Sequence, residues 1–378
     1  MFKIQTLNKI SAEGLANFPR DDYEIASEIL NPDAILLRSA DMHSMELPAS
    51  VKAVARAGAG VNNIPIPAMT EKGVVVFNTP GANANAVKEL VIAALLFSSR
   101  PVHKAAEWAK TLAGKGDEIP DLAEKGKSQF VGPEIKGKTL GVIGLGMDVI
   151  GYDPYISVDA AWSLSRAVHK AESLESLLSK SDYVSLHIPQ TNDTKGFINA
   201  DRINMMKKGV RLLNFARGGL VVNKDVIAAI EAGKIAQYIT DFTDEELLAN
   251  DKVICLPHLG ASTPEAEDNC AFMAVKQLKD FLERGNIVNS VNFPKTYLDA
   301  PIPVGGTRLC IANKNVPNMV GQISTILADA KLNIEGMVNQ NRADLAYNLI
   351  DVSCPVSDDV VAKLKSIEGV INVRCIAG

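Results

Sequence analysis

Three polar segments in the middle of the chain carry residue types that can do acid–base chemistry on a small substrate. Residues 214–219 contain Arg217, residues 240–245 contain Glu245, and residues 257–263 contain His258. A guanidinium group can bind a carboxylate through two hydrogen bonds, and an imidazole titrates near neutral pH and can exchange a proton with a hydroxyl group. Each residue also has an ordinary explanation, since a lone histidine is more often structural and an arginine at a strand end is often ion-paired.

Apolar runs predict the strands that would position these segments. Residues 210–215 lead into Arg217, and residues 253–256 lead into His258. In an open sheet of parallel strands, ligands bind outside the carboxyl ends of the strands. We therefore expect all three polar segments to face one crevice.

A glycine-rich turn followed by an acid predicts a dinucleotide site in the same part of the chain. Gly144 and Gly146 follow the apolar residues 139–143, and Asp153 ends the next short strand. Glycine lets the backbone approach a pyrophosphate, and an acid at the second strand end binds a ribose 2′-hydroxyl and favours NAD over NADP. A lone Gly-x-Gly is also compatible with an ordinary tight turn.

Part of this dinucleotide motif is missing. Gly146 runs directly into Met147 and the next strand, so the third glycine and the crossover helix have no place. Asp153 lies 153 − 144 = 9 positions after Gly144, where about 20 are usual, and parallel strands need a connection of about a dozen residues. We infer that a segment between Gly146 and Met147 is either deleted, or disordered and left out of the sequence. A chain that truly lacks it should bind NAD poorly or not at all.

Alternating strands and helices predict an α/β fold with doubly wound parallel sheets. Strands are expected at residues 34–37, 51–55 and 74–77, and a helix at 84–98 is apolar nearly all round and so expected to be buried. These belong to a flavodoxin-like substrate-binding domain.

The same pattern sets the predicted domain limits. The substrate-binding domain is expected to be discontinuous, covering 1–98 and 270–298, with a long return helix after Pro264. Residues 99–269 are expected to form a Rossmann nucleotide domain, in which the polar residues 110–138 could form an exposed arm. A linker rich in proline and glycine then leads to a small βαββαβ domain at 305–378.

Composition excludes several classes of protein. The net charge of −5 argues against a general nucleic-acid binder, because binding to a phosphate backbone needs a basic surface. No apolar run reaches the ~20 residues of a membrane span, and the first residues lack the apolar core of a signal peptide. The five cysteines are scattered without a CxxC pair, which predicts a reduced cytoplasmic protein without a metal site.

Taken together, these segments resemble the D-isomer-specific 2-hydroxyacid dehydrogenases over nearly the whole chain. Further matching segments are residues 56–64, 78–80, 85–90 and 187–191. In this family a hydride passes between NAD and the carbinol carbon of the substrate. The resemblance implies that His258 exchanges the hydroxyl proton, that Glu245 orients the imidazole, and that Arg217 binds the substrate carboxylate and polarises the carbonyl group.

The resemblance also implies the residues that hold the cofactor. Glu245 is chosen because residues 242–245 resemble the family's Phe-Pro-x-Glu, and the adjacent Glu246 remains an alternative. The residues expected at NAD are Gly144, Gly146, Asp153, His187, Pro189, Thr191, Ala216, Asp241 and Gly260.

In the first domain, two predicted strand ends carry the residues expected to bind substrate. By resemblance, the backbone amides of Gly58, Ala59 and Gly60 hold the substrate carboxylate, helped by Asn62 or Asn63. Arg38, followed by Ser39, ends another strand, and a guanidinium there suits the phosphate of a phosphorylated acid. Arg38 and Arg56 could instead be surface charges.

The C-terminal domain resembles the ACT regulatory module. Asn315 and Asn333 match its amino-acid-binding positions, which implies serine as an effector. Asn318 stands where a glycine commonly follows the proline, and Asn313 where some relatives have histidine. A module that serves only oligomerisation is the alternative.

This module favours the family members that oxidise 3-phospho-D-glycerate to 3-phosphohydroxypyruvate with NAD, the first step of serine biosynthesis. The alternatives are another dehydrogenase of the family, such as a glyoxylate or hydroxypyruvate reductase, and a non-catalytic NAD-sensing scaffold. The resemblance further implies a homodimer through the nucleotide domain. Pairing of the C-terminal domains could extend it to a homotetramer.

Overall fold

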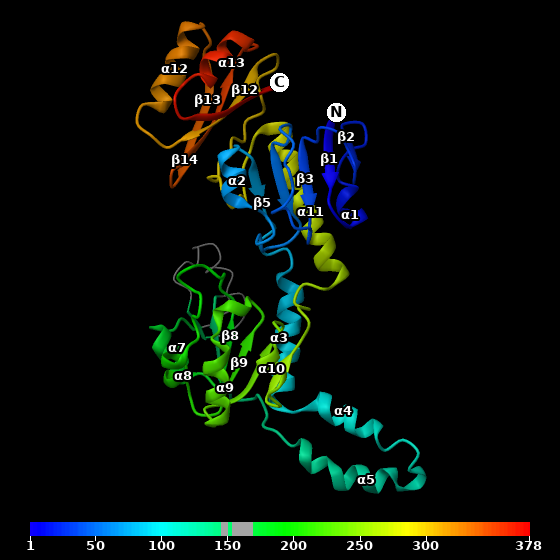
Figure 1. Cartoon of the computed structure of the whole chain (residues 1–378). Helices are drawn as coiled ribbons and strands as arrows, with labels where there is room; N and C mark the ends of the chain where they lie inside the picture. The colour runs from blue at the N-terminus through cyan, green and yellow to red at the C-terminus, as the bar shows by residue number, and fades with distance from the viewer. Residues whose placement is uncertain (145–149, 153–168) are drawn as a thin grey trace. The chain divides into compact units, whose positions relative to one another are not determined.

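The computed structural model of the chain describes residues 1–144, 150–152 and 169–378. The chain divides into two compact units, of which the first contains Met1–Ala84 and Thr263–Gly378 and the second contains Asn85–Ser262. Figure 1 shows the elements of both units. Each unit is described by itself.

A five-stranded parallel sheet forms the centre of the first unit. Its strands are β1 (Phe2–Thr6), β2 (Tyr23–Ala26), β3 (Ala34–Leu37), β4 (Ala53–Arg56) and β5 (Val75–Phe77), in the order β2-β1-β3-β4-β5. This is the flavodoxin-like order, and it confirms the predicted fold class. The buried strands β3, β4 and β5 were predicted. The amphipathic β1 and β2, in which only Ile4 and Tyr23 are buried, were not.

The long helix α11 (Pro264–Arg284) and the short helix α1 (Ala12–Leu15) pack in one apolar cluster with this sheet, and α2 (Ile66–Glu71) packs in a separate cluster with it. Thr263 caps the first turn of α11 by accepting a hydrogen bond from the backbone N–H of Ala266, and Gly285 ends the helix in the left-handed conformation with φ 76°. The predicted return helix is therefore present. It carries the chain from the end of the second unit back onto the first sheet.

The second unit contains a parallel sheet that covers six strands in the described part of the chain. They are β6 (Leu140–Ile143), β7 (Ile150–Tyr152), β8 (Tyr183–Leu186), β9 (Val210–Asn214), β10 (Ile235–Thr240) and β11 (Val253–Cys255). The order β11-β10-β9-β8-β6-β7 reverses direction between β6 and β8. This switch point is where doubly wound sheets bind dinucleotides.

Helices flank this second sheet. They are α3 (Ala84–Ser99), α7 (Leu174–Lys180), α8 (Ala200–Met205), α9 (Asn223–Glu231) and α10 (Glu245–Leu248). The prediction that α3 is buried all round is only half correct. Val91 and Ala94 pack into the core, whereas Ile92 and Leu96 are 45% and 46% exposed.

An arm projects from the second unit (Figure 1), and it begins at Val102, eight positions before the predicted range of 110–138. It consists of α4 (Val102–Lys110), η1 (Gly116–Glu118), α5 (Ile119–Gly126) and η2 (Lys127–Phe130), and none of these elements buries a residue. The rings of Trp108 and Phe130 lie 5.4 Å apart and hold the two sides of the arm together. The arm is thus helical although it lacks a core of its own.

The C-terminal residues form the predicted βαββαβ fold. Its elements are β12 (Thr307–Lys314), α12 (Met319–Asp329), β13 (Ile334–Arg342), β14 (Leu345–Val352), α13 (Asp358–Lys365) and β15 (Val370–Ala377). The strands form an antiparallel sheet in the order β13-β14-β12-β15, and both helices pack on one apolar core with it.

A continuous interior joins this C-terminal fold to the substrate-domain sheet. Cys310, Tyr347 and Leu349 share one apolar cluster with Phe77 of β5 and Phe281 of α11. The Tyr347 hydroxyl donates to the carbonyl oxygen of Gly285 at 3.0 Å. The division into two units accordingly keeps residues 305–378 with the first unit.

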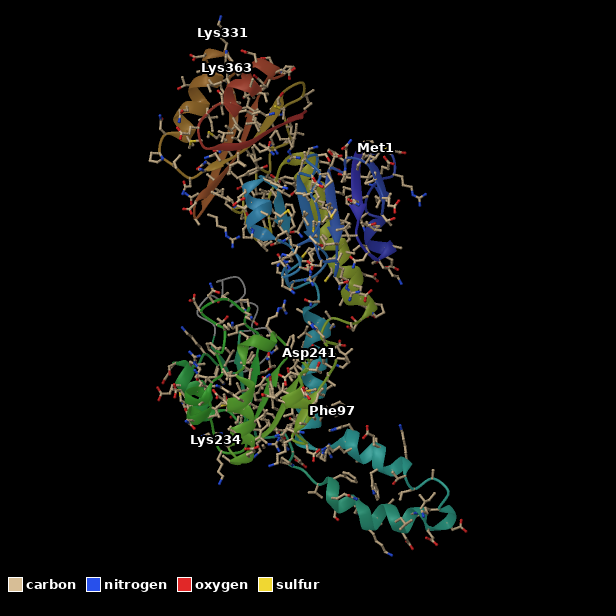
Figure 2. All side chains as sticks on the ribbon, viewed as in Figure 1. Met1, Phe97, Lys234, Asp241, Lys331 and Lys363 are labelled. Carbon is tan, nitrogen blue, oxygen red and sulfur yellow. The ribbon has the colours of Figure 1, made fainter. Side chains whose placement is uncertain are left out.

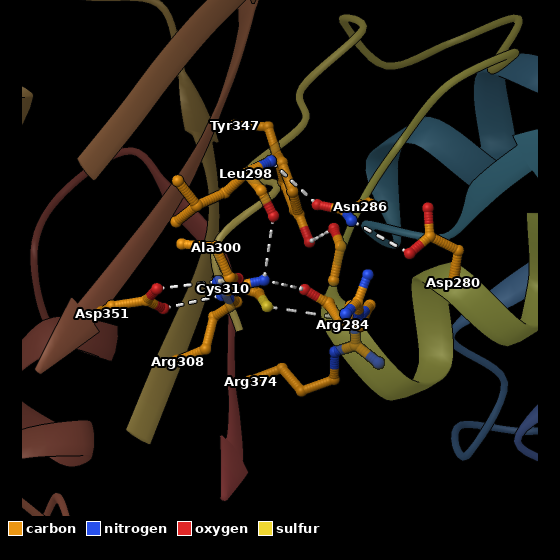
Figure 3. Close-up of polar contacts among 11 residues, drawn as sticks. Asp280, Arg284, Asn286, Leu298, Ala300, Arg308, Cys310, Tyr347, Asp351 and Arg374 are labelled. Carbon is orange, nitrogen blue, oxygen red and sulfur yellow. Dashed lines mark hydrogen bonds and ion pairs between the residues drawn. The ribbon is translucent and has the colours of Figure 1, made fainter. Parts of the chain in front are cut away.

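A buried arginine fixes the linker at the same junction (Figure 3). Arg308 is completely buried, and its Nε and Nη2 donate to the two carboxylate oxygens of Asp351 at 2.6 and 2.7 Å. Its remaining hydrogen bonds go to the carbonyl oxygens of Arg284, Leu298 and Ala300. Because a guanidinium has five N–H donors, every donor is used.

The two units meet in the sequence at 84/85 and 262/263, whereas the predicted domain limits fall at 98/99 and 269/270. Helix α3 belongs with the second unit because its buried face packs on Tyr183, Leu213 and Ile239. No helix within the described ranges has the length and apolar character that crossing a membrane requires.

Candidate active site

Three neighbouring strands of the second sheet bring the predicted reactive residues to one edge. Arg217 follows β9, Asp241 follows β10, and His258 follows β11, and these strands are adjacent in the sheet. Because the strands are parallel, their carboxyl ends lie on the same side. Figure 2 labels Asp241 at this edge.

Asp241 organises the edge through its backbone and its side chain. It is 2% exposed, its Oδ2 accepts a hydrogen bond from the Gly260 N–H at 3.0 Å, and its carbonyl oxygen accepts one from the His258 N–H at 3.0 Å. Burial raises the pKa of Asp241, while the Gly260 hydrogen bond and the charges of His258 and Arg217 act against the rise. The second carboxylate oxygen, Oδ1, is buried without a partner in the described part of the chain. A buried acceptor of this kind suits a ligand that brings a donor.

His258 is held in a strained backbone conformation. Its φ of 53° lies in the left-handed region, which residues other than glycine seldom adopt. Two backbone acceptors, on Asp241 and Leu256, fix its N–H. The imidazole is exposed and stands edge-on to the Phe242 ring, with 5.1 Å between centroids. The backbone is therefore fixed while the imidazole faces solvent.

Arg217 projects from a turn that Asn214 stabilises. The buried Asn214 side chain donates to the Arg217 carbonyl oxygen at 2.9 Å and accepts from the Ala216 N–H at 3.2 Å. The guanidinium donates through Nη1 to the carbonyl oxygen of Ala216 at 2.6 Å. Within the described residues its other donors have no partner, so they remain available for an anionic substrate.

Among the described residues, no carboxylate is hydrogen-bonded to the His258 imidazole. Glu245 and Glu246 both lie exposed in the first turn of α10, which the Asp244 side chain caps through the Leu247 N–H at 2.8 Å. In the described part of the chain neither glutamate makes a hydrogen bond to His258. The choice between them therefore rests on the sequence.

The predicted cofactor residues gather at the ends of β6 and β8. Gly144 has φ 88°, and a Cβ on it would come 2.5 Å from the carbonyl oxygen of His187, so only glycine fits. The His187 ring nitrogen Nε2 contacts the Ser185 hydroxyl at 2.8 Å, and burial lowers the pKa of His187 to about 4. This imidazole is consequently neutral at physiological pH.

The remaining predicted cofactor residues occupy loops at the same edge, except for two. Pro189 and Thr191 lie in a turn that Thr194 closes by donating to the Pro189 carbonyl oxygen at 2.7 Å. Ala216 and Gly260 flank Arg217 and His258. Gly146 and Asp153 lie outside the described residues.

The predicted gap at Gly146 and Met147 also lies outside the described residues. The strands on either side are described: β6 and β7 pair in parallel, and residues 144–149 connect them. Six residues are about half the shortest usual crossover between parallel strands. The sequence itself runs without interruption from Gly146 to Met147.

Predicted substrate residues lie at the carboxyl ends of β3 and β4 in the first unit. Arg38 Nη1 makes an ion pair with Glu267 Oε1 of α11 at 2.5 Å, and the Ser39 hydroxyl accepts from the Asn8 amide at 2.9 Å. Arg56 donates through Nε to the Arg38 carbonyl oxygen at 2.9 Å and through Nη1 to that of Gly60. Glu267 and Asn8 were not predicted, because both reach this edge from distant parts of the sequence.

The glycine loop after β4 is held by polar side chains. Asn78 donates to the carbonyl oxygen of Ala59 at 2.7 Å, and the N–H of Thr79 donates to that of Gly58 at 3.1 Å. The carbonyl oxygen of Asn62 lies 3.0 Å from Nε2 of His43. Fixing these carbonyl groups also fixes the direction of the loop's amide groups.

A cavity of about 160 Å³ lies at the end of the C-terminal sheet. That volume is close to the ~150 Å³ of a cavity that holds benzene. Asn315 lines it, whereas Asn333 does not and donates instead to Glu335 at 3.0 Å. Asn313 and Asn339 also line it, and both bond to the buried Asn348, at 2.7 and 2.6 Å. The sequence did not single out Asn339 or Asn348, because their pairing depends on the register of β12, β13 and β14.

Comparison with known proteins identifies the class to which this fold and this edge belong. The NAD-binding domain of the D-isomer specific 2-hydroxyacid dehydrogenases matches residues 92–260. The D-3-phosphoglycerate dehydrogenase of Haemophilus influenzae is 33% identical over 347 positions, which cover 83% of this chain and 78% of that protein. The chain therefore belongs to the D-isomer-specific 2-hydroxyacid dehydrogenase family and carries the family's NAD-binding domain.

Other relatives carry the same name. The D-3-phosphoglycerate dehydrogenase of Methanocaldococcus jannaschii is 35% identical over 302 positions, which cover 73% of this chain and 55% of that protein. The NAD+-bound 3-phosphoglycerate dehydrogenase of Entamoeba histolytica superposes with a TM-score of 0.60 at 25% identity, covering 79% of this chain and 99% of that one. The chain spans about half the length of several curated relatives that it matches.

The Haemophilus influenzae comparison contains positions that have no residue of this chain. In the Haemophilus influenzae comparison, 83% of 378 residues is about 314 residues, against 347 aligned positions. About 33 positions of that relative accordingly have no counterpart here.

Proposed function

We propose that this chain oxidises 3-phospho-D-glycerate to 3-phosphohydroxypyruvate with NAD, the reaction that opens serine biosynthesis, and that it acts in the cytoplasm. The observation that carries the proposal is the meeting of Arg217, Asp241 and His258 at the ends of three adjacent strands. The name shared by relatives more than 30% identical supports the substrate.

The chemistry follows from the residue types at this edge. NAD, when bound, accepts the hydride that leaves the carbinol carbon. His258 takes the hydroxyl proton as the C–O bond becomes a carbonyl group, and releases it to solvent afterwards. Glu245, or Glu246 beside it, would stabilise the imidazolium in the charged state. Arg217 would bind the substrate carboxylate and polarise the adjacent oxygen.

The residues that would hold NAD are those at the ends of β6, β8 and β10. Gly144 leaves space for close approach at the switch point, and the unpartnered Oδ1 of Asp241 offers an acceptor for the nicotinamide half. His187 is neutral, so it adds no charge there. Pro189, Thr191, Ala216 and Gly260 line the neighbouring loops.

In the first unit, Arg38 would bind the substrate phosphate, because a guanidinium matches the geometry of a phosphate. The amides of Gly58, Ala59 and Gly60 would bind the carboxylate, with Asn62 beside them.

Steady-state formation of NADH tests the proposal directly. The chain should prefer 3-phosphoglycerate to D-glycerate, and His258→Asn should abolish turnover while leaving the fold intact. His169→Asn is the matched control, because His169 is an exposed histidine of the same unit. Equal use of the two acids would instead favour a hydroxypyruvate or glyoxylate reductase. NAD binding without turnover in the unaltered chain would favour a sensing scaffold.

We further propose that an amino acid such as serine binds the C-terminal cavity and regulates the enzyme. The cavity lining is rich in amide side chains, including Asn313, Asn315 and Asn339, which can both donate and accept. Serine titrated onto the chain should bind, and Asn315→Ala should weaken that binding. If serine does not bind, the domain serves assembly alone.

The assembly that we propose is a homodimer through the arm and α3, extended to a homotetramer by the C-terminal sheets. Ile92, Val102 and Val131 are 45%, 48% and 78% exposed although they are apolar. Burial of such residues in an interface would be favourable. Light scattering should report a dimer or tetramer, and Val131→Asp should shift it toward smaller species.

A further inference from the structure

An ion pair between β3 and α11 links the phosphate-binding candidate to a residue that the sequence did not single out. Arg38 Nη1 lies 2.5 Å from Glu267 Oε1, and the two side chains are 36% and 42% exposed. Both residues belong to the first unit. The pair joins the carboxyl end of a strand to the first turn of the long return helix.

The main chain on both sides of this pair is fixed. The Arg38 N–H donates to the Asn8 side chain at 3.0 Å, and the Arg38 carbonyl oxygen accepts from Arg56 Nε at 2.9 Å. On the helix, the Glu267 N–H donates to the Thr263 carbonyl oxygen at 3.1 Å, and the next residue, Asp268, accepts from the Ser11 hydroxyl. The Arg38 side chain itself has one partner in the described chain, which is Glu267.

The geometry of the pair leaves the bidentate edge of Arg38 open. Glu267 occupies Nη1, and no described residue accepts from Nε or Nη2. The same chain shows what this edge can hold: Arg308 uses Nε and Nη2 to bind both oxygens of the Asp351 carboxylate. An oxyanion can therefore bind the Nε–Nη2 edge of Arg38 without displacing Glu267.

A second observation concerns the residue one turn further along α11. Cys270, one turn beyond Glu267, is 5% exposed. Burial raises the pKa of its thiol, while Thr79 and the charges of Arg38 and Arg56 act against the rise.

We propose that Glu267 is a positioning residue for recognition of the phosphorylated substrate: it holds the Arg38 guanidinium with its Nε–Nη2 edge turned outward to receive a phosphate group. This role rests on the proposed function. A free arginine side chain has many rotamers, and ordering it before binding lowers the entropy lost when the phosphate binds. Glu267 thereby adds to affinity without touching the substrate.

The test compares dissociation constants for 3-phosphoglycerate and D-glycerate, measured by calorimetry, with KM and kcat measured alongside. Glu267→Ala should weaken 3-phosphoglycerate binding about fivefold, as a weak exposed ion pair allows, and leave D-glycerate binding and kcat unchanged. Glu267→Asp should keep part of the affinity, because it retains a carboxylate charge to pair with the Arg38 guanidinium. Glu265→Ala is the matched control, since Glu265 is another acid of the same first turn.

The outcomes separate this role from the proposed function. If the unaltered chain binds both acids equally, phosphate recognition fails and the role of Glu267 fails with it. If the unaltered chain prefers 3-phosphoglycerate and Glu267→Ala keeps that preference, only the positioning role fails. Tighter phosphoglycerate binding by Glu267→Ala would show that the carboxylate competes with the phosphate, which also overturns the proposal.

Discussion

The buried pair of Arg308 and Asp351 gives the sharpest prediction about stability. Replacing Asp351 by Asn would leave a fully buried guanidinium without a counter-charge. Removing one partner of a buried ion pair destabilises a protein by about 3–5 kcal/mol. Arg308 keeps three carbonyl acceptors, on Arg284, Leu298 and Ala300, so we expect a loss near the lower end, about 3 kcal/mol, in the free energy of unfolding of the first unit.

The double variant Arg308→Met/Asp351→Leu separates charge from packing. It removes both charges but leaves the three carbonyl groups without their donor, so it should be less stable than the unaltered chain. Its loss should still be smaller than the sum of the two single losses, because neither single variant can avoid an unpaired buried charge. Asp359→Asn is the control, since Asp359 pairs with Lys363 on the surface of the same domain. We expect no measurable effect there.

Urea unfolding can be monitored by hydrogen exchange at residues 307–314 and 345–352. This exchange reports on the junction between the C-terminal domain and the substrate-domain sheet. Both tryptophans, Trp108 and Trp162, fall in the range Asn85–Ser262. Tryptophan fluorescence therefore follows the other unit and should not change. If the free energy of unfolding of the Asp351→Asn variant lies within about 1 kcal/mol of that of the unaltered chain, the reasoning that the pair is buried and coupled is refuted.

Three further predictions concern the cofactor edge and the helix end. Burial lowers the pKa of His187 from 6.5 to about 4. Between these two pH values the unfolded chain is protonated at His187 while the folded chain is not. Up to about 3 kcal/mol of the free energy of unfolding, present above pH 6.5, is therefore lost as the pH falls toward 4. Denaturant unfolding of His187→Gln should show a flatter dependence in that window, and an unchanged slope would contradict the assignment. Inserting a relative's crossover segment between Gly146 and Met147 should lower the dissociation constant for NAD at least about tenfold, because the segment supplies the helix N-terminus that binds pyrophosphate. Calorimetry measures this constant, and an equal affinity would mean that the present connection suffices. Gly285→Ala should destabilise the first unit more than Gly233→Ala destabilises the second. Both glycines have positive φ, but of the two only Gly285 has an atom, Cys310 Sγ at 2.4 Å, where a Cβ would lie. Similar losses in thermal unfolding would show that the residues around Gly285 move to make room for the Cβ.

The amino-acid sequence alone was enough to predict the layers of the fold. Mainly apolar strands such as β3 and β8, and the end of α11 at Gly285, follow from local patterns that need no distant partner. The βαββαβ order of the C-terminal domain was predicted for the same reason. Strands with mixed residues, such as β1, were missed because they contain polar residues and, in β1, only Ile4 is buried.

Which residues meet was decided by the tertiary structure. The sequence placed Arg217 and His258 at strand ends, but only the order β11-β10-β9 makes those ends neighbours and puts the buried carboxylate of Asp241 between them. Arg38 and Glu267 stand 229 positions apart (267 − 38), and Arg308 gains its acceptors from α11, the linker and β14. Such pairs depend on how elements pack, because a side chain's partner is set by position in space. Periodicity along the chain reports only which face of its own element a residue occupies.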